Sequence, residues 1–269
     1  YVKELCAAKW DSVEAISALT EAVGAAEDPA QKVALYVLMG RWYGAHLNRP
    51  DFALPCYSQA LQTDPVNEGA LDGSVELYRK AQSYPELAGI LLRRAEIATH
   101  PVRARDFKAE AAEIIHRKLG DASRASDLFE QVLSADPAHP RATDSLESIY
   151  AEKKAWPELA KLMEKKAAGQ RGAARVDTLS GIAELYEDRL SDPDKAVVQY
   201  LAVMAEDARN LAALKGLERI YTQKGKYDDL LTNLRTQLET VATPRQRISI
   251  LERIGGILEE EFVDHKRAA

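Results

Sequence analysis

Apolar residues in the middle of the chain recur at the spacing of an amphipathic helix. They fall at Ala125, Leu128, Phe129, Val132 and Leu133, three and four residues apart. Asp136-Pro137 ends this run, because proline disfavours the helical conformation in the residue before it. A second apolar run follows and ends at Tyr150. The pattern predicts two helices joined by a short turn.

The same pattern is present before and after this segment. The matching residues are separated by 72 and 71 positions at Ala53, Ala125 and Ala196, and again at Tyr78, Tyr150 and Tyr221. A third set, separated by 74, 72 and 71 positions, is Trp10, Tyr84, Trp156 and Tyr227. A period that persists over so many positions indicates stacked structural repeats, in which each unit packs on its neighbours.

The breaks between the apolar runs predict an all-α fold of about fourteen or fifteen helices, paired as antiparallel hairpins. We expect one continuous array in residues 1–269, cut within a repeat at both ends and therefore a piece of a longer protein or the ordered part of one. The expected hairpins are 1–28 (partial), 29–65, 66–101, 102–137, 138–172, 173–208, 209–244 and 245–269 (partial). Successive regular and degenerate hairpins together form the unit of about 72 residues.

The residues resemble those of tetratricopeptide repeats, helical hairpins of about 34 residues. The second-helix pattern of that family is matched by Ala53, Tyr57, Ala60 and Pro65, and in part by Ala125, Phe129 and Pro137. The resemblance covers nearly the whole chain, is of the kind found in bacterial tandem arrays, and implies a right-handed α-α superhelix. It also implies that the first helices line a concave surface that holds a protein or peptide.

Small residues recur on the first helices of the regular hairpins. They are Gly40, Ala112, Ala183 and Gly255, at steps of 72, 71 and 72. We expect these residues to be buried where helices cross, because a larger side chain would hold the backbones apart. The aromatic residues that begin second helices, Tyr84 among them, could form a ladder for ligand stacking, but packing within the hairpin is the favoured interpretation.

Composition and charge exclude some classes of function. The net charge is −6 and the chain has no basic stripe, so nucleic-acid binding is not expected. No apolar run approaches the length of a membrane span, and a cytoplasmic location is expected. Cys56 lies on an amphipathic pattern and is expected in the core; Cys6 and Cys56 are too far apart for a metal-binding motif.

No motif for chemistry is found. The five histidines have no ligand spacing, and each is expected on the solvated surface: His46, His100, His116, His139 and His265. Gly169–Gly172 lacks the Lys-Ser/Thr of a phosphate-binding loop. We therefore expect no enzyme activity, no metal and no other cofactor.

One surface carries functional information through the resemblance. The residues that it implies for partner binding are Asp72, Glu76, Glu110, Glu113, Asp144, Asp177, Glu184, Lys215 and Arg219. Because acids predominate, the sequence predicts a scaffold that binds a basic or amphipathic segment of a protein. Two alternatives stay open: the acids form an ordinary solvated surface, or the array is a regulatory or sensor region coupled to an output domain.

Overall fold

The computed structural model describes residues 12–260. They form fourteen α-helices and one π-helical segment, without a β-strand. The chain divides into two compact units, an N-terminal unit of residues 1–145 and a C-terminal unit of residues 146–269. The all-α helical-repeat fold that the periodicity predicts is confirmed.

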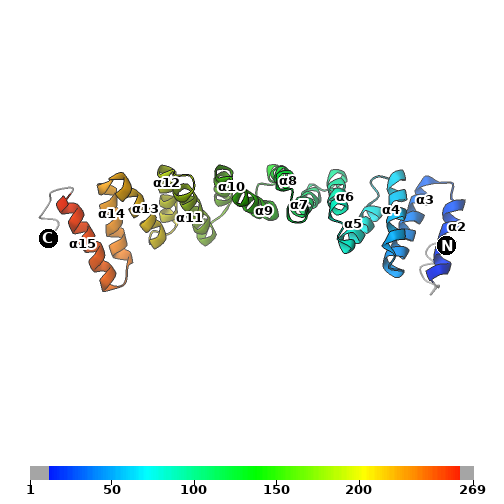
Figure 1. Cartoon of the computed structure of the whole chain (residues 1–269), viewed down its shortest axis with the longest axis horizontal. Coiled ribbons are helices and arrows are strands. Elements are labelled where there is room, and N and C mark those ends of the chain that lie inside the picture. The colour runs from blue at the N-terminus through cyan, green and yellow to red at the C-terminus, as the bar shows by residue number, and fades with distance from the viewer. Residues whose placement is uncertain (1–11, 261–269) are drawn as a thin grey trace. The chain divides into compact units, whose positions relative to one another are not determined.

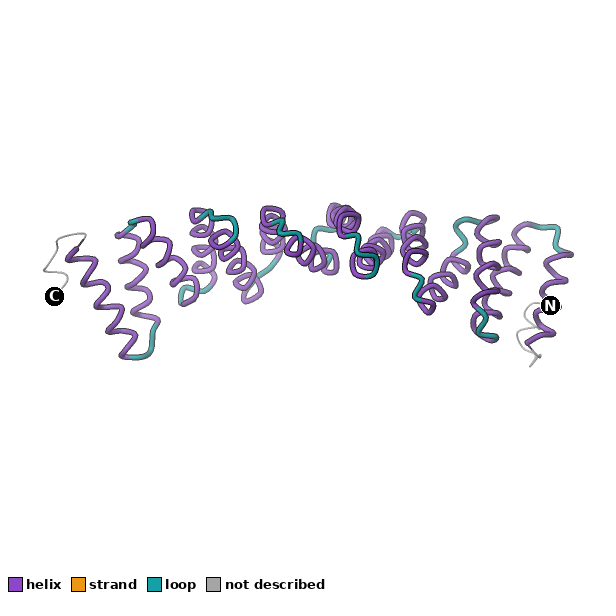
Figure 2. Tube along the Cα trace, viewed as in Figure 1, coloured by secondary structure: helices purple, strands orange, loops and turns teal. Residues whose placement is uncertain are grey.

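The N-terminal unit is a series of helices joined by short turns (Figures 1 and 2). The helices are α2 (Ser12–Ala25), α3 (Pro29–Arg41), the π-helical segment η1 (Trp42–His46), α4 (Pro50–Thr63), α5 (Glu68–Ala81), α6 (Tyr84–Ile97), α7 (Pro101–Arg117) and α8 (Ala122–Ala135). Each packs on the helix that follows it, from α2 to α8. Antiparallel hairpins are the expected result of such short connections.

The boundary between the units falls within α9 (Pro140–Glu152). The C-terminal unit continues with α10 (Trp156–Gly169), α11 (Gly172–Asp188), α12 (Pro193–Glu206), α13 (Leu211–Lys224), α14 (Tyr227–Thr240) and α15 (Pro244–Glu260). Consecutive helices from α10 to α15 pack on one another. The first helices of the hairpins are α11, α13 and α15, as α3, α5 and α7 are in the N-terminal unit.

Side chains in the turns set where the first helices begin. The Asn67 side chain accepts a hydrogen bond from the Ala70 N–H, 3.0 Å away, and caps α5. Asn210 caps α13 in the same way at 3.0 Å. Such caps stabilise a helix because its first N–H groups have no partner within the helix.

His139 stands at the equivalent position before α9, and its predicted surface location is wrong. The residue is buried, with 8% of its area exposed. Its Nδ1 accepts the Ala142 N–H at 3.3 Å, and its Nε2 lies 3.3 Å from Asp106 Oδ1. The imidazole thus replaces the capping asparagine of the other two repeats, with the proton on Nε2 donated to the carboxylate.

The core of each unit includes a buried aromatic residue from a second helix. In the N-terminal unit Tyr57 is buried among Val33, Ala53 and Leu71. In the C-terminal unit Tyr200 is buried with Ala183 and Leu217. Cys56 is also buried, as predicted.

Three of the four small residues expected at helix crossings are buried: Gly40, Ala112 and Ala183. Gly255 is only half-buried, and the expectation for it is wrong. The reason is that α15, within the described residues, packs mainly against α14 and leaves its other side uncovered.

Candidate partner-binding surface

The residues predicted to bind a partner lie on the first helices of five hairpins. Asp72 and Glu76 are on α5, Glu110 and Glu113 on α7, Asp144 on α9, Asp177 and Glu184 on α11, and Lys215 and Arg219 on α13. Glu110 and Glu113 are half-buried, and the other seven residues are exposed. The structure therefore leaves most of them accessible, but it gives them different electrostatic surroundings.

On α7 the predicted acids connect neighbouring first helices. Arg79 on α5 places its Nη2 2.5 Å from Glu110 Oε1. Arg141 on α9 approaches Glu113 Oε2 to 3.6 Å, and Arg117 holds the other oxygen of that carboxylate at 3.0 Å. The charges of Glu110 and Glu113 are thus largely neutralised within the chain.

The two acids on α5 are also paired. Asp72 lies 2.5 Å from Arg94 Nη2 on α6, and the Arg94 guanidinium rests on the Phe107 ring with its carbon 4.0 Å from the ring centre. Glu76 pairs with Lys80 one turn later at 2.7 Å. The N-terminal unit therefore offers little unpaired negative charge at the predicted positions.

In the C-terminal unit, Glu187 on α11 is the centre of a hydrogen-bond network. Arg219 on α13 donates to both carboxylate oxygens, with Nε and Nη2 each 2.9 Å from its acceptor. The Tyr200 hydroxyl on α12 donates to the same carboxylate at 2.8 Å. This bidentate geometry fixes Arg219, one of the predicted residues, to the side of α11.

The pKa values of these three groups reflect the network. Burial favours the neutral form of Glu187, but hydrogen bonds from Arg219 and Tyr200 outweigh it and lower the pKa of the carboxyl. Burial, followed by the hydrogen bond to Glu187, raises the pKa of the Tyr200 phenol. The hydrogen bond to Glu187 raises the pKa of Arg219. The carboxylate and the guanidinium are therefore both charged at neutral pH.

A second ion pair of the same kind joins α13 to α15, where Arg253 lies 2.6 Å from Glu218. Sequence reasoning did not anticipate the arginines that connect first helices: Arg79, Arg141, Arg219 and Arg253. A usable signal exists, because each pairs with a glutamate roughly one hairpin away in the sequence, at separations of 31, 28, 32 and 35 residues.

Among the predicted acids, those without an ion pair in the described residues lie on α11. Asp177 and Glu184 form no ion pair within residues 12–260, and both are exposed. Asp188 is exposed on the same side of the helix, since spacings of seven and four residues return to one face. Lys215 on α13 is exposed and has no ion-pair partner in the described part of the chain.

The aromatic residues that begin the second helices are partly buried. Tyr84, Trp156 and Tyr227 are the first residues of α6, α10 and α14, and each is half-buried. Trp156 and Tyr227 pack against the core of the C-terminal unit. Trp10 lies outside the described residues, as do Cys6 and His265.

Two further observations concern the described residues alone. Within residues 12–260, no group of three or more His, Cys, Asp or Glu side chains is arranged to hold a metal ion. None of the helices in that range has both the length and the apolar character needed to cross a membrane.

Comparison with known proteins finds a family match for one segment of the chain. Residues 213–248, which cover most of α13, all of α14 and the start of α15, match the family model of the tetratricopeptide repeat. No curated protein matches the sequence. Many solved structures are similar to the chain.

The protein YrrB, described as a tetratricopeptide-repeat protein with an unusual peptide-binding site, is 15% identical with a TM-score of 0.42, over 74% of this chain and 97% of that one. A tetratricopeptide repeat protein from Parabacteroides merdae is 14% identical with a TM-score of 0.40, over 90% and 91%. A chain of the Naa15/Naa10 complex bound to HypK-THB is 16% identical with a TM-score of 0.48, over 96% and 41%. The repeated helical hairpins show a helical-repeat fold, and within it residues 213–248 match the tetratricopeptide repeat.

Proposed function

We propose that the chain is a protein-interaction scaffold that binds a basic or amphipathic segment of a partner against the first helices of its C-terminal unit. The observation that carries the proposal is the exposed face of α11, where Asp177, Glu184 and Asp188 follow one another along one side. A helical repeat array presents such faces as an extended surface, and a helix or peptide lying along it is a common mode of recognition.

The ion pairs within the chain restrict the proposed binding surface to α11, because they neutralise the predicted acids on α7. Glu110 and Glu113 are engaged with arginines, so their contribution to attracting a cation is small. On α11, by contrast, Asp177 and Glu184 have no such partner among residues 12–260. The Glu187–Arg219 pair beside them holds α11 and α13 together, and the acidic face therefore rests on a rigid support.

The expected role of these charges is selection and steering. An acidic surface raises the rate of encounter with a basic partner and disfavours an acidic one. Exposed charge pairs contribute about 0–1 kcal/mol each, so most of the affinity must come from apolar contacts made after encounter.

The experiment begins with the purified chain as bait and identification of the protein retained. The partner is then titrated into the unchanged chain and into the variant D177N/E184Q/D188N. A matched control, E158Q/D228N/E239Q, removes the same number of charges from the exposed surface of α10 and α14. We expect the α11 variant to bind several-fold more weakly and the control to bind as before. An acidic partner, or equal affinity for both variants, contradicts the proposal.

A further inference from the structure

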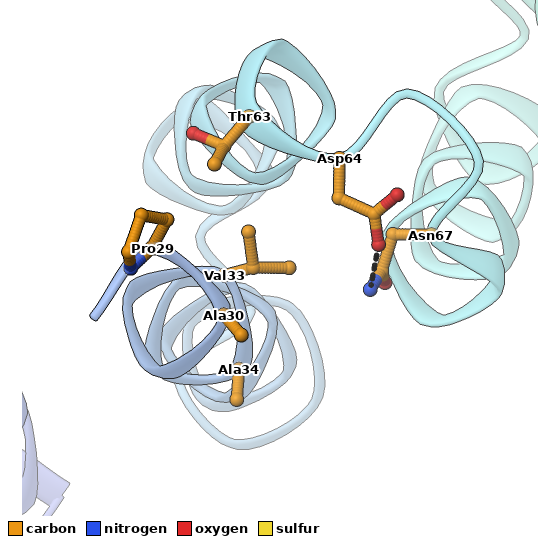
Figure 3. Close-up of a pocket in the computed structure, with 7 residues that line it drawn as sticks. All are labelled: Pro29, Ala30, Val33, Ala34, Thr63, Asp64 and Asn67. Carbon is orange, nitrogen blue, oxygen red and sulfur yellow. Dashed lines mark hydrogen bonds between the residues drawn. The ribbon is translucent and has the colours of Figure 1, made fainter.

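A pocket of about 440 Å³ opens at the start of the first complete hairpin, between α3, the end of α4 and the start of α5 (Figure 3). One wall is apolar and comes from the first two turns of α3, with Ala30, Val33 and Ala34. The opposite side is polar, formed by Asp64 and Asn67 in the turn after α4. The pocket combines an apolar wall with a carboxylate at its end.

The Asp64 carboxylate is held in place without a cation. Its Oδ1 accepts the Val66 N–H at 3.3 Å, and its Oδ2 accepts Asn67 Nδ2 at 3.0 Å, the contact drawn in Figure 3. Asp64 makes no ion pair within the residues that the structure describes. It also follows the C-terminal end of α4, where the helix dipole adds to the negative potential.

The repeat that contains α7 and α8 has a different side chain at the position of this pocket. Seventy-two residues after Val33 and Asp64 stand Arg105 and Asp136. The Arg105 side chain lies across the turn with its Nε 3.7 Å from Asp136 Oδ2, close enough for an ion pair. That nitrogen is buried and makes no hydrogen bond within the described part of the chain. An arginine of the chain itself thus fills the position that Val33 leaves open.

In the repeat that contains α11 and α12, an arginine stands one residue before the position aligned with Val33 and Arg105. Arg175, near the start of α11, has its Nε 3.3 Å from Glu206 at the end of α12. The corresponding residues of the first repeat are Lys32 and Thr63. Lys32 does not line the pocket and makes no ion pair among the described residues. Asp207, the residue of the third repeat aligned with Asp64, likewise accepts a backbone N–H and an asparagine side-chain N–H and makes no ion pair among the described residues. Of the three related turns, the one after α4 alone shows, among the described residues, no ion pair between an arginine near the start of its first helix and an acid at the turn.

We infer that this pocket binds an arginine side chain supplied by a protein partner. The guanidinium would pair with Asp64, as Arg105 pairs with Asp136, and the aliphatic stem would cover Ala30, Val33 and Ala34. The inference rests on the proposed scaffold function and adds a second, separate contact point for a basic partner. The pocket lies in the N-terminal unit, far in sequence from the acidic face of α11.

The direct probe is N-acetyl-arginine amide, with the neutral isostere N-acetyl-citrulline amide as its control. The full chain carries labelled alanine and valine methyl groups and is titrated with each probe while its NMR spectrum is recorded. We expect the Ala30, Val33 and Ala34 signals to shift saturably with the arginine probe and not with citrulline. D64N should weaken binding of the arginine probe by about tenfold, because a charge-assisted contact is lost.

Two substitutions exchange the residues at the aligned positions 33 and 105. V33R should fill the pocket from within and abolish the shifts at Ala30 and Ala34. R105V should open the equivalent pocket beside Asp136 and add saturable shifts in Val102. Circular dichroism of each variant checks that the helices are retained, and D64N provides a test that leaves the apolar wall unchanged.

The outcomes separate this inference from the proposed function. If a basic partner binds D64N and V33R as tightly as the unchanged chain, and the probe produces no saturable shift, the inference is overturned while the scaffold function stands. If the probe binds at the pocket with the expected dependence on Asp64, yet no basic protein binds the chain, the pocket stands and the proposed function fails.

Discussion

The Tyr57 phenol lies directly against the backbone of Gly73. A Cβ atom added at Gly73 would stand 2.2 Å from Tyr57 Cζ, and one added at Gly40 would stand 2.5 Å from the other side of the ring. The ring is therefore enclosed between α3 and α5. Tyr200 lies in the same way against Gly216, because a Cβ atom added at Gly216 would stand 2.4 Å from Tyr200 Cζ.

In the next repeat, 72 residues further along the chain, both residues of this contact are replaced. Phe129 stands at the position of Tyr57, and Ser145 stands at the position of Gly73. Both are buried. Loss of the phenol oxygen at one position accompanies gain of a small side chain at the other, which is the exchange expected in a close-packed core.

The first prediction concerns Gly73. G73A should lower the free energy of unfolding by about 1–3 kcal/mol, because Tyr57 is 3% exposed and has no room to move away. Gly89 on α6 is the matched control: nothing lies within 4 Å of its added Cβ, and G89A should stabilise by about 0.5–1 kcal/mol through helix propensity. Urea unfolding measures both. Equal effects in the two variants would contradict the close contact.

The double variant Y57F/G73S extends this test. It copies the next repeat, and it should be more stable than the sum of its single variants predicts. Strict additivity in the double-mutant cycle would show that the two positions do not share one space.

The second prediction concerns the alanines at the crossings of first and second helices. A112L and A183L should each cost about 1–3 kcal/mol by overpacking, since both positions are fully buried. Ala205 on α12 is exposed, and A205L should change stability little. Melting of all three variants at the temperature of the unchanged chain would show that these crossings tolerate larger side chains.

The third prediction concerns the capping role of His139. H139N should keep α9 capped, because Asn67 and Asn210 perform this role at equivalent positions. H139A should cost about 1 kcal/mol, the usual effect of removing a capping side chain. Thermal unfolding of the two variants distinguishes capping from simple burial. If H139N is as unstable as H139A, the hydrogen bond from Ala142 contributes nothing.

The repeat period accounts for much of what the sequence could predict. The small residues Ala112 and Ala183 are encoded at a constant spacing, and their burial depends on helices adjacent in the sequence. Gly255 has the same spacing, yet its burial depends on what packs on the outer side of α15. Burial is thus predictable within a hairpin and less so at the last described helix.

The electrostatic character of the surface was harder to predict. Glu110 and Glu184 look alike in the sequence, but Arg79 forms an ion pair with the first, and no basic residue in the described part of the chain forms one with the second. Such pairing depends on side-chain direction across two hairpins, which a list of charges does not contain. His139 was misplaced for a related reason, since its role is apparent only beside Asn67 and Asn210.

The fourth prediction is a pH dependence from Glu187. Its folded-state pKa lies below the ordinary value, which is about 4.3 for an unfolded chain. The contribution of its ionised form to stability is therefore complete above that value and is lost as the pH falls through the folded-state pKa. E187Q should be less stable than the unchanged chain at pH 6, and the difference should shrink toward pH 3. Urea midpoints across this range measure it, and a constant difference would contradict the network.

The central claim is that unpaired acids on α11 select a basic partner, and its most direct test is the association rate constant of the captured partner across a salt series. The rate for the unchanged chain should fall steeply as salt rises, because screening shortens the reach of exposed charges to about 8 Å at physiological ionic strength. D177N/E184Q/D188N should associate more slowly at low salt, with a much shallower dependence, while E158Q/D228N/E239Q should follow the unchanged chain. An association rate that neither salt nor the α11 substitutions alter would contradict the claim.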